Sequence, residues 1–315
     1  MNKAVVFGGS GFVGSHLVRG FNIDYLNCDL VESEDCYQYC DVRNPIEIKA
    51  GNIDVIYNLA AVHKTPGHEY EEYFETNIYG AENVCNYARE HKINTIVFTS
   101  SIAPYGSWEE EKYEDSLPLP TSAYGSSKLV AEEIHKRWQS EKPDERTLVI
   151  VRPGVVFGLG EGGNFSRLYQ TLKSGFFLYP GRKDTKKAAI YVRDLVRLMQ
   201  EMAETLPRGV HTYNAVYPEP HTIEQICETI SNVIETRSLR ITVPASLLIF
   251  VSYIIMGIGK ILGGRFKSVH PDRVKKLMIS TNIIGKKLER DGFNLNYSLK
   301  EALVDWFAVE QDASK

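Results

Sequence analysis

The stretch that decides the fold is Lys3 to Phe21, KAVVFGGSGFVGSHLVRGF. A short apolar run reads as a strand, glycines follow at positions 8, 11 and 14, and an apolar helical pattern begins at once. Glycines without side chains permit a sharp turn, let a pyrophosphate approach the backbone, and let strand and helix pack closely, while the helix N-terminus supplies positive dipole. The stretch therefore predicts a strand, turn and helix that bind a dinucleotide, against the plainer interpretation of an ordinary strand-to-helix turn.

A carboxylate stands where such a unit needs one. Asp29 ends the second predicted strand, 21 positions after Gly8, close to the spacing of about 20 residues expected for a side chain that hydrogen-bonds a ribose 2′-hydroxyl. A negative charge there repels a 2′-phosphate, so NAD is favoured over NADP. Asp41 and Val42 follow a third strand and could meet the adenine, although Asp41 could equally be a turn aspartate.

Short apolar runs alternate with helical patterns through the first half of the chain. Further apolar runs stand at 54–61 (DVIYNLAA), 95–101 (TIVFTSS) and 148–154 (LVIVRPG). This alternation is typical of a parallel sheet covered on both faces, so the predicted fold class is α/β, a Rossmann-type doubly wound parallel sheet.

The pattern loosens from about Val156, where 157–164 (FGLGEGGN) and 178–187 (LYPGRKDTKK) read as loops. A smaller C-terminal lobe is expected to begin there. We expect an NAD-binding domain at residues 1–155 with about 186–216, and a substrate-binding lobe at about 156–185 and 217–315.

Composition excludes several classes of protein. The 315 residues are 43% hydrophobic and 24% charged, as in ordinary globular proteins. A net charge of −4 gives no general attraction to nucleic acid. The cysteines form no C-x-x-C pair, which argues against a disulfide framework and a zinc knuckle and favours a reducing cytoplasm, with no metal site expected. They are Cys28, Cys36, Cys40, Cys85 and Cys227.

One later segment differs from the rest. Ile241 to Gly259 (ITVPASLLIFVSYIIMGIG) has no charged residue, and residues 260–290 then carry nine basic side chains against two acidic ones. An apolar helix followed by a basic cluster suits peripheral contact with the anionic cytoplasmic face of a membrane. Pro244 and two glycines weaken a spanning interpretation. The alternative is a buried helix beside a solvated basic face.

Tyr124 stands four residues before Lys128 in 121–133 (TSAYGSSKLVAEE), which reads as the start of a helix. A secondary alcohol gives up a hydride only if its hydroxyl proton leaves too, so such chemistry needs a base. A tyrosine is a poor base at pH 7 unless a neighbouring cation stabilises the phenolate, and a lysine one helical turn away can do so. Two side chains that merely share a helix face are the alternative.

Together with 58–61 (NLAA), 99–106 (TSSIAPYG) and 152–158 (RPGVVFG), these motifs resemble the extended short-chain dehydrogenase/reductase family, and within it the NAD-dependent sugar epimerases and dehydratases. The motifs occur in the family's order over nearly the whole chain. The resemblance implies NAD at the C-terminal ends of the sheet strands, a sugar held by the smaller lobe, and a homodimer.

By resemblance, Tyr124 is the acid/base, Lys128 lowers its pKa and holds the nicotinamide ribose, and Ser101 hydrogen-bonds the reacting oxygen, with Ser100 as the competitor. The family often has asparagine at the position of Val155, so this chain departs from the family's pattern there. The implied cofactor contacts are Gly8, Gly11, Phe12, Val13, Gly14, Asp29, Asp41, Val42, Leu59, Ala60, Ala61, Tyr124, Lys128, Pro153 and Val156.

The reaction is expected to be epimerisation at C4 of a hexose through a 4-keto intermediate. Dehydratases of the family place an acidic pair after the catalytic serine, whereas Ile102 and Ala103 follow Ser101 here. A 4-keto-sugar reductase or dehydrogenase, and a non-catalytic NAD-binding scaffold or sensor, remain as alternatives.

For the substrate, the resemblance implies that Asn164, Lys187 and Arg273 hold a diphosphate, although each could be a solvated polar side chain. The chain is also similar to a narrower group, bacterial epimerases that act on N-acetylglucosamine carried by undecaprenyl diphosphate. That similarity implies bacterial surface polysaccharide synthesis, such as O-antigen, at the cytoplasmic face of the inner membrane. A UDP-linked N-acetylhexosamine is the rival substrate.

Overall fold

A seven-stranded parallel sheet forms the larger part of the molecule, in the order β11-β6-β5-β4-β1-β2-β3. The computed structural model describes residues 1–33, 36–63, 68–250, 253 and 278–313. The strand order changes direction between β1 and β4, which opens a crevice at the carboxyl ends of these strands. The predicted doubly wound parallel sheet is confirmed. Its strands are β1 (Lys3–Phe7), β2 (Asp24–Asp29), β3 (Tyr37–Tyr39), β4 (Val55–Asn58), β5 (Thr95–Thr99), β6 (Thr147–Pro153) and β11 (Gly209–Ala215).

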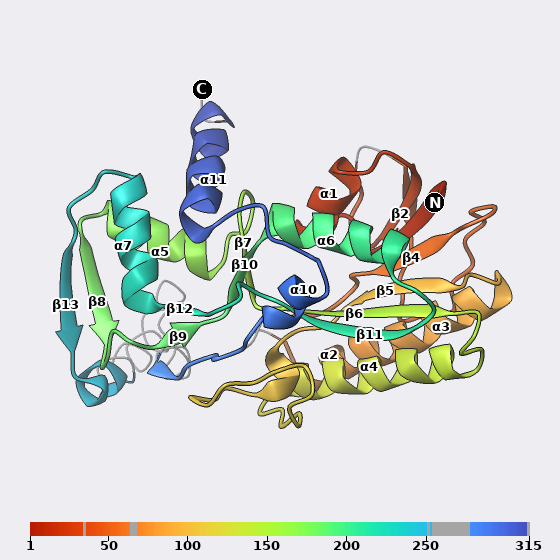
Figure 1. Ribbon diagram of the computed structural model, residues 1–315, viewed down its shortest axis with the longest axis horizontal. Coiled ribbons are helices and arrows are strands. Elements are labelled where there is room, and N and C mark those ends of the chain that lie inside the picture. Colours follow the sequence, from red (N-terminus) through yellow and green to blue (C-terminus); the bar gives the residue numbers. More distant parts are fainter. Residues whose placement is uncertain (34–35, 64–67, 251–252, 254–277, 314–315) are drawn as a thin grey trace.

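Helices cover both faces of this sheet (Figure 1). α1 (Phe12–Arg19) and α6 (Val192–Thr205) lie on one face, and α3 (Gly80–Glu90) and α4 (Ala123–Ser140) lie on the other. Successive side chains of a strand point to opposite faces. Accordingly, Ala4 and Val6 of β1 belong to the core on the α6 side, and Val5 and Phe7 to the core on the α3 and α4 side. Burial on both faces explains why the strands read as continuous apolar runs.

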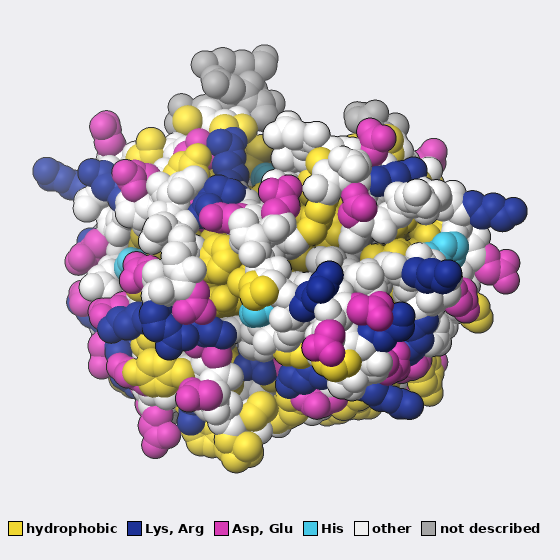
Figure 2. All heavy atoms as spheres, turned by 45° about the vertical axis from the view of Figure 1, so that its right-hand side comes forward, with side chains coloured by type: hydrophobic (Ala, Val, Ile, Leu, Met, Phe, Trp, Pro, Cys, Tyr) yellow, Lys and Arg dark blue, Asp and Glu magenta, His cyan; other side chains and the backbone are white. Residues whose placement is uncertain are grey.

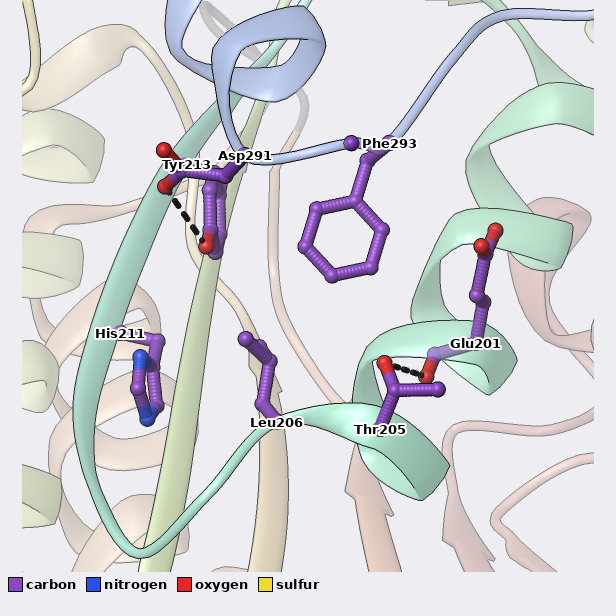
Figure 3. A pocket seen from close by; sticks show the side chains of 8 residues that line it. Glu201, Thr205, Leu206, His211, Tyr213, Asp291 and Phe293 are labelled. Carbon is purple, nitrogen blue, oxygen red and sulfur yellow. Dashed lines mark hydrogen bonds between the residues drawn. The ribbon is translucent and has the colours of Figure 1, made fainter.

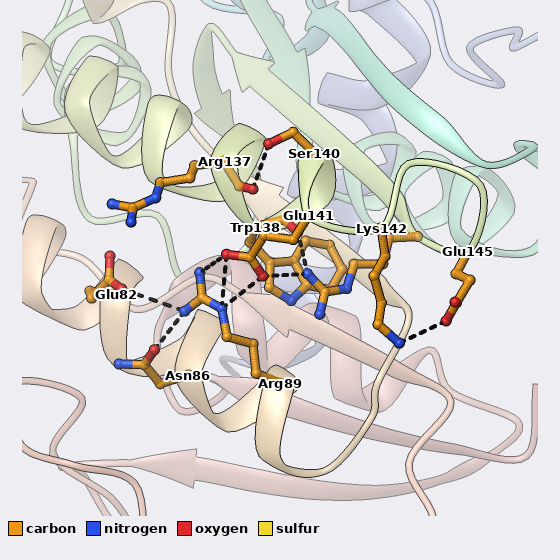
Figure 4. Close-up of polar contacts among 10 residues, drawn as sticks. Glu82, Asn86, Arg89, Arg137, Trp138, Ser140, Glu141, Lys142 and Glu145 are labelled. Carbon is orange, nitrogen blue, oxygen red and sulfur yellow. Dashed lines mark hydrogen bonds and ion pairs between the residues drawn. The ribbon is translucent and has the colours of Figure 1, made fainter.

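Both ends of α4 are fixed by polar contacts. At its start, the Ser122 hydroxyl accepts a hydrogen bond of 3.1 Å from the backbone N–H of Gly125 and caps the helix. Beyond its end, the Glu141 carboxylate pairs with Arg89 of α3 at 2.7 Å and with Arg146 at 2.8 Å (Figure 4). The guanidinium of Arg146 also lies 4.6 Å from the centre of the Trp138 ring. The first turn of α4 is therefore held at a defined place above the sheet.

The smaller lobe lies at the other end of the molecule (Figure 1). Its α7 contacts both α5 and α11, and two short strands pair in parallel beside them. Its elements are α5 (Asn164–Lys173), β8 (Phe176–Pro180), β9 (Lys186–Lys187), β12 (His221–Thr222), α7 (Ile223–Val233), β13 (Leu239–Val243) and α11 (Leu299–Ala313). The pair β7 (Val155–Phe157) and β10 (Ala189–Tyr191) and the short helix α10 (Lys286–Arg290) connect the lobe to the sheet.

Two expectations about this lobe are wrong in part. The stretch 178–187, expected to be a loop, contains the end of β8 and all of β9. The apolar stretch 241–259, expected to be a helix, begins as strand: Ile241, Thr242 and Val243 pair with β8, as suits β-branched residues. Helix follows from Ala245 to Phe250, and 251–252 and 254–259 lie outside the described residues.

Within the described part of the chain, no helix combines the length and the apolar character needed to cross a bilayer. On the face shown in Figure 2, basic and acidic side chains are interspersed with apolar ones.

Candidate active site

The glycine turn after β1 is packed against the end of β4. Gly8 has φ +84°, and a Cβ there would lie 2.6 Å from the backbone nitrogen of Ala60. A Cβ at Gly14 would lie 2.2 Å from the carbonyl oxygen of Gly8. The turn, the end of β4 and the start of α1 thus form one cradle of exposed backbone, in which the predicted Leu59 and Ala60 lie against Gly8 and Ala61 follows them in the chain. Phe12 and Val13, the first residues of α1, are partly buried behind it.

Asp29 borders this cradle. One carboxylate oxygen accepts a hydrogen bond of 3.0 Å from the backbone N–H of Ser10, and the other accepts one of 3.1 Å from Val31. From the same strand, Asn27 donates to the Ser10 hydroxyl at 3.1 Å, while its buried side-chain oxygen has no hydrogen-bond partner. A carboxylate beside unobstructed backbone at a switch point fits a dinucleotide, with its pyrophosphate on the turn and a ribose at Asp29.

The two residues expected near the adenine are already engaged. Arg43 donates to the Asp41 carboxylate through Nε at 2.9 Å and through a terminal nitrogen at 2.7 Å, and these bonds hold the pKa of Asp41 below its usual value. Val42 is buried, and a Cβ at Gly80 would lie 2.9 Å from it. Val42 therefore supports the loop, and Asp41 reaches an adenine only beside the Arg43 guanidinium.

The side chains of Ser101 and Tyr124 meet between the end of β5 and the first turn of α4, and Lys128 follows Tyr124 one turn further along that helix. The side chains of Ser101 and Tyr124 share a hydrogen bond that lowers the pKa of the phenol, but burial has the larger effect and raises that pKa to about 12. The direction is opposite to the expected one, because the phenol is desolvated. Ser100 is turned away: its buried hydroxyl donates to Glu132 at 2.5 Å. Of the two candidate serines, Ser101 is the one that meets the tyrosine.

Lys128 is buried between α4 and the sheet. It is 2% exposed, and its ammonium nitrogen lies 4.6 Å from the centre of the Phe98 ring. Burial lowers its pKa to about 7, and the negative charge of Glu132 acts in the opposite direction. His135, two turns further along the helix, stacks on Phe98 with ring centres 4.1 Å apart, and burial lowers its pKa to about 4. This histidine is therefore neutral at pH 7.

The sequence did not predict the polar residues around the predicted catalytic residues Ser101, Tyr124 and Lys128. Glu132 receives two hydrogen bonds from Arg152, of 2.9 and 2.6 Å. Asn77 lies in η1 (Glu75–Tyr79), a π-helical turn between α2 (Tyr70–Phe74) and α3, and its amide donates to Ser127 at 2.9 Å. The spacing contained a signal for Glu132, since it stands four residues after Lys128 on the same helix face. Asn77 had no such signal because a π-helical turn shifts the helical register.

The remaining predicted residues lie toward the smaller lobe. The Pro153 carbonyl accepts a hydrogen bond of 3.1 Å from Ile102, next to Ser101, and Val156 lies in β7. Asn164 is the exposed first residue of α5. Lys187 donates to the carbonyl oxygen of Ile279 at 2.7 Å, and burial lowers its pKa to about 8. Arg273 lies outside the described residues.

A separate hollow of about 490 Å³ lies over β11, between the end of α6 and the turn after α10 (Figure 3). It contains no predicted site residue, and it lies away from the carboxyl ends of the strands where parallel sheets bind nucleotides. We assign it no part in catalysis. Its lining is Glu201, Thr205, Leu206, His211, Tyr213, Asp291, Gly292 and Phe293.

Comparison with known sequences gives a family and several relatives. Residues 4–215 match the model of the NAD dependent epimerase/dehydratase family. The chain is 28% identical over 311 residues to an N-acetyl-alpha-D-glucosaminyl-diphospho-ditrans,octacis-undecaprenol 4-epimerase from Escherichia coli O157:H7, covering 96% of this chain and 93% of that protein. It is 29% identical over 223 residues to a UDP-glucose 4-epimerase from Vibrio cholerae, covering 63% of this chain and 66% of that protein.

Solved structures share the fold. The UDP-N-acetylglucosamine 4-epimerase from Bacillus cereus superposes with a TM-score of 0.74 at 18% identity, covering 99% of this chain and 97% of that one. The predicted extended short-chain dehydrogenase/reductase resemblance, the enzyme class and the NAD cofactor are confirmed by the family match and the sequence relatives. The chain belongs to the NAD dependent epimerase/dehydratase family.

Proposed function

We propose that this enzyme is a 4-epimerase of an N-acetylhexosamine carried on a diphosphate, with undecaprenyl diphosphate as the carrier. The observation that carries the proposal is the hydrogen bond between Ser101 and Tyr124 beside the dinucleotide crevice. Ile102 and Ala103 follow that serine, so no carboxylate stands next to it to remove a second proton from the sugar. The site is therefore equipped to move one proton at one sugar hydroxyl, as an epimerase or a reductase needs.

Each residue has a role in that proton transfer. Tyr124 takes the proton of the C4 hydroxyl as hydride leaves C4, and returns it when hydride arrives on the other face. Ser101 holds the sugar oxygen within reach of the phenol. Because burial raises the pKa of Tyr124 to about 12, the phenolate needs positive charge nearby, and Lys128 is the buried cation on the same helix face. NAD, when bound, accepts the hydride and contributes a positively charged ring.

An epimerase must also let the 4-keto sugar turn over between the two hydride transfers. A substrate held mainly by its diphosphate can turn about that anchor while the ring stays free. Lys187 suits the anchor, because it is a half-buried cation at the edge of the smaller lobe, and Asn164 is the first residue of a helix of that lobe. Many members of the family that the chain resembles have arginine at the position of Lys187. A lysine binds a phosphate as a single point charge, whereas an arginine can donate two parallel hydrogen bonds.

Two observations support the lipid carrier. The relative from Escherichia coli O157:H7, whose name gives a diphospho-undecaprenol substrate, matches almost the full length of this chain. Apolar side chains also stand exposed on β13 and on the helical stretch after it, where Phe250 is 63% exposed. An exposed apolar strip beside the sugar lobe suits contact with acyl chains. The exposed side chains are Leu239, Ile241, Leu247, Phe250 and Tyr253.

The proposal includes a setting for the enzyme. We infer peripheral contact with the inner face of the cytoplasmic membrane and a role in bacterial surface polysaccharide synthesis. The NAD domain is proposed as residues 1–155 with about 186–216, and the sugar lobe as about 156–185 with 217–315. A homodimer is proposed from the family resemblance, and light scattering of the purified protein measures it.

The substrate test compares two carriers. The purified protein is incubated with NAD and either undecaprenyl-diphosphate-linked or UDP-linked N-acetylglucosamine, and the released sugars are separated. N-acetylgalactosamine is expected from the lipid-linked substrate, and no product is expected from either substrate with Tyr124→Phe. Conversion of the UDP-linked sugar alone would refute the lipid carrier. Conversion of neither, with NAD still bound, would refute N-acetylglucosamine as the sugar.

A further inference from the structure

A buried chain of polar contacts starts beside the catalytic serine and runs through Glu132. The Glu132 side chain is fully buried, and it accepts hydrogen bonds from Ser100 and from two nitrogens of Arg152. Arg152 is itself only 4% exposed and donates to the Tyr105 hydroxyl. Every polar atom of the Glu132 carboxylate thus has a partner, as a buried charge requires.

The chain of contacts continues to the smaller lobe. The Tyr105 hydroxyl donates to Asn214 at 2.9 Å, and the Asn214 amide donates to the carbonyl oxygen of Ile284 at 3.1 Å. Ile284 precedes α10, and its backbone N–H donates to the carbonyl oxygen of Lys112 at 2.9 Å. The Ser100 turn, the catalytic helix and the edge of the sugar lobe therefore share one set of contacts.

Glu132 also lies on the same helix face as Tyr124 and Lys128. It stands four residues after Lys128, which stands four residues after Tyr124, so the three lie along one face of α4. Its negative charge favours the protonated form of the buried Lys128. Other titratable side chains close to these residues are His135 of α4, Tyr73 of α2 beside Tyr124, Tyr105 of the 3₁₀ turn Ala103–Tyr105, and Arg152 of β6.

We propose that Glu132 is a positioning residue of the proton-transfer site: clamped by Arg152, it orients the turn that carries Ser101 and favours the ammonium form of Lys128, one helical turn from Tyr124. This inference deepens the proposed function and rests on it. Glu132 does not touch the sugar or the cofactor. It acts through Ser100 and Lys128, and the Arg152 clamp fixes the distance from which it acts.

The test uses the full chain with NAD, and Glu132→Gln is compared with Glu133→Gln. Glu133 is the next residue and is 62% exposed in an ion pair with Lys136, so its substitution controls for the helix. Protein labelled with ¹³C at lysine Cε is titrated by NMR, and the Lys128 signal is the one missing from Lys128→Met. The Lys128 titration midpoint is expected to fall by about one pH unit in Glu132→Gln. No change is expected in Glu133→Gln.

Turnover gives the second readout. The kcat of Glu132→Gln is expected to fall about tenfold, with the KM for the sugar little changed. Its alkaline limb is expected to move to lower pH by the same interval as the Lys128 midpoint. An unmoved Lys128 midpoint would overturn the inference, whatever happens to kcat. The NMR titration needs no sugar, so failure of the proposed substrate and failure of this inference remain distinguishable.

The single variant leaves Arg152 buried without its partner, which can prevent folding. The double variant Glu132→Gln/Arg152→Gln removes both charges of the buried pair, and Lys128 can lose its proton, so this variant is expected to fold. Its Lys128 midpoint should again lie below that of the wild-type protein. A folded double variant with the wild-type midpoint would show that the pair only fills space.

Discussion

The ammonium nitrogen of Lys128 lies 4.6 Å from the centre of the Phe98 ring, in a position that leaves 2% of the lysine exposed. The ring attracts the cation, but the loss of water outweighs this attraction and the pKa of Lys128 falls to about 7. The enzyme therefore keeps a lysine at a place where folding disfavours its charged form.

Lys128→Met should stabilise the fold while removing activity. The folded pKa of about 7 lies below the unfolded value of 10.5, so the unfolded chain binds more protons between these values and wild-type stability rises with pH in that window. Methionine has no such penalty. The variant should have the higher free energy of unfolding at pH 7, by a few kcal/mol, and a smaller advantage at pH 9.5. Urea unfolding at both pH values measures this; an equal difference at both would contradict it.

Gly14→Ala should damage NAD binding and stability together. Its Cβ would lie 2.2 Å from the Gly8 carbonyl oxygen and 2.6 Å from the Gly9 Cα, and backbone atoms cannot move aside cheaply. We expect a loss of about 1–3 kcal/mol in stability and at least a tenfold weaker NAD affinity by calorimetry. Gly20→Ala, at the other end of α1, meets nothing closer than 3.4 Å and is the control. Similar losses in both variants would refute this role of the turn.

Asp29→Asn should weaken NAD binding and reduce the preference of the enzyme for NAD over NADP. The carboxylate accepts from Ser10 and from Val31, and an amide has only one accepting oxygen. NAD affinity should fall about tenfold, as expected for loss of a charged hydrogen bond, while repulsion of a 2′-phosphate disappears. Calorimetry with both cofactors tests this, with Asp24→Asn at the exposed start of β2 as control. An unchanged ratio of the two affinities would exclude Asp29 from cofactor choice.

Glu141→Gln should loosen the far end of the catalytic helix. Arg89 and then Arg146 lower the pKa of Glu141 to about 2, so this carboxylate stabilises the fold above its unfolded pKa and the contribution is lost as the pH falls through about 2. Because Glu141 is 36% exposed, we expect a loss of only about 1 kcal/mol at pH 7.

Urea unfolding should show that the difference in the free energy of unfolding between Glu141→Gln and the wild-type protein shrinks as the pH is lowered from 5 toward 2. The wild-type carboxylate then takes up a proton and becomes neutral, like the glutamine. Glu145→Gln, which breaks the exposed pair with Lys142 in the same region (Figure 4), should have no measurable effect. Equal losses in the two variants would contradict the clamp by the two arginines.

Local sequence determines the part of the fold that could be predicted. The strands at Lys3–Phe7, Val55–Asn58 and Thr147–Pro153 are mostly apolar because helices bury both their faces, and such runs can be recognised in the sequence alone. β3 and β13 are short and half exposed, so their pattern is weak. Ile241–Val243 became strand through pairing with β8, a contact that no local pattern contains.

The candidate site divides in the same way. Gly8, Asp29, Tyr124 and Lys128 follow spacings that a helix or a turn imposes, so the sequence alone brought them together as a hypothesis. Glu132 and Arg152 meet across α4 and β6, 20 positions apart in the chain. Their pairing, and with it the orientation of Ser100 toward Glu132, follows from tertiary packing that spacing does not encode.

The central claim is that hydride leaves C4 and returns to the opposite face of the same sugar. The most direct test uses lipid-linked N-acetylglucosamine with deuterium at C4 and catalytic NAD. Mass and NMR analysis of the released sugar should show N-acetylgalactosamine that retains deuterium at C4, with no net change in absorbance at 340 nm. Loss of the deuterium to solvent, or a 4-keto sugar formed in step with reduced cofactor, would contradict a 4-epimerase.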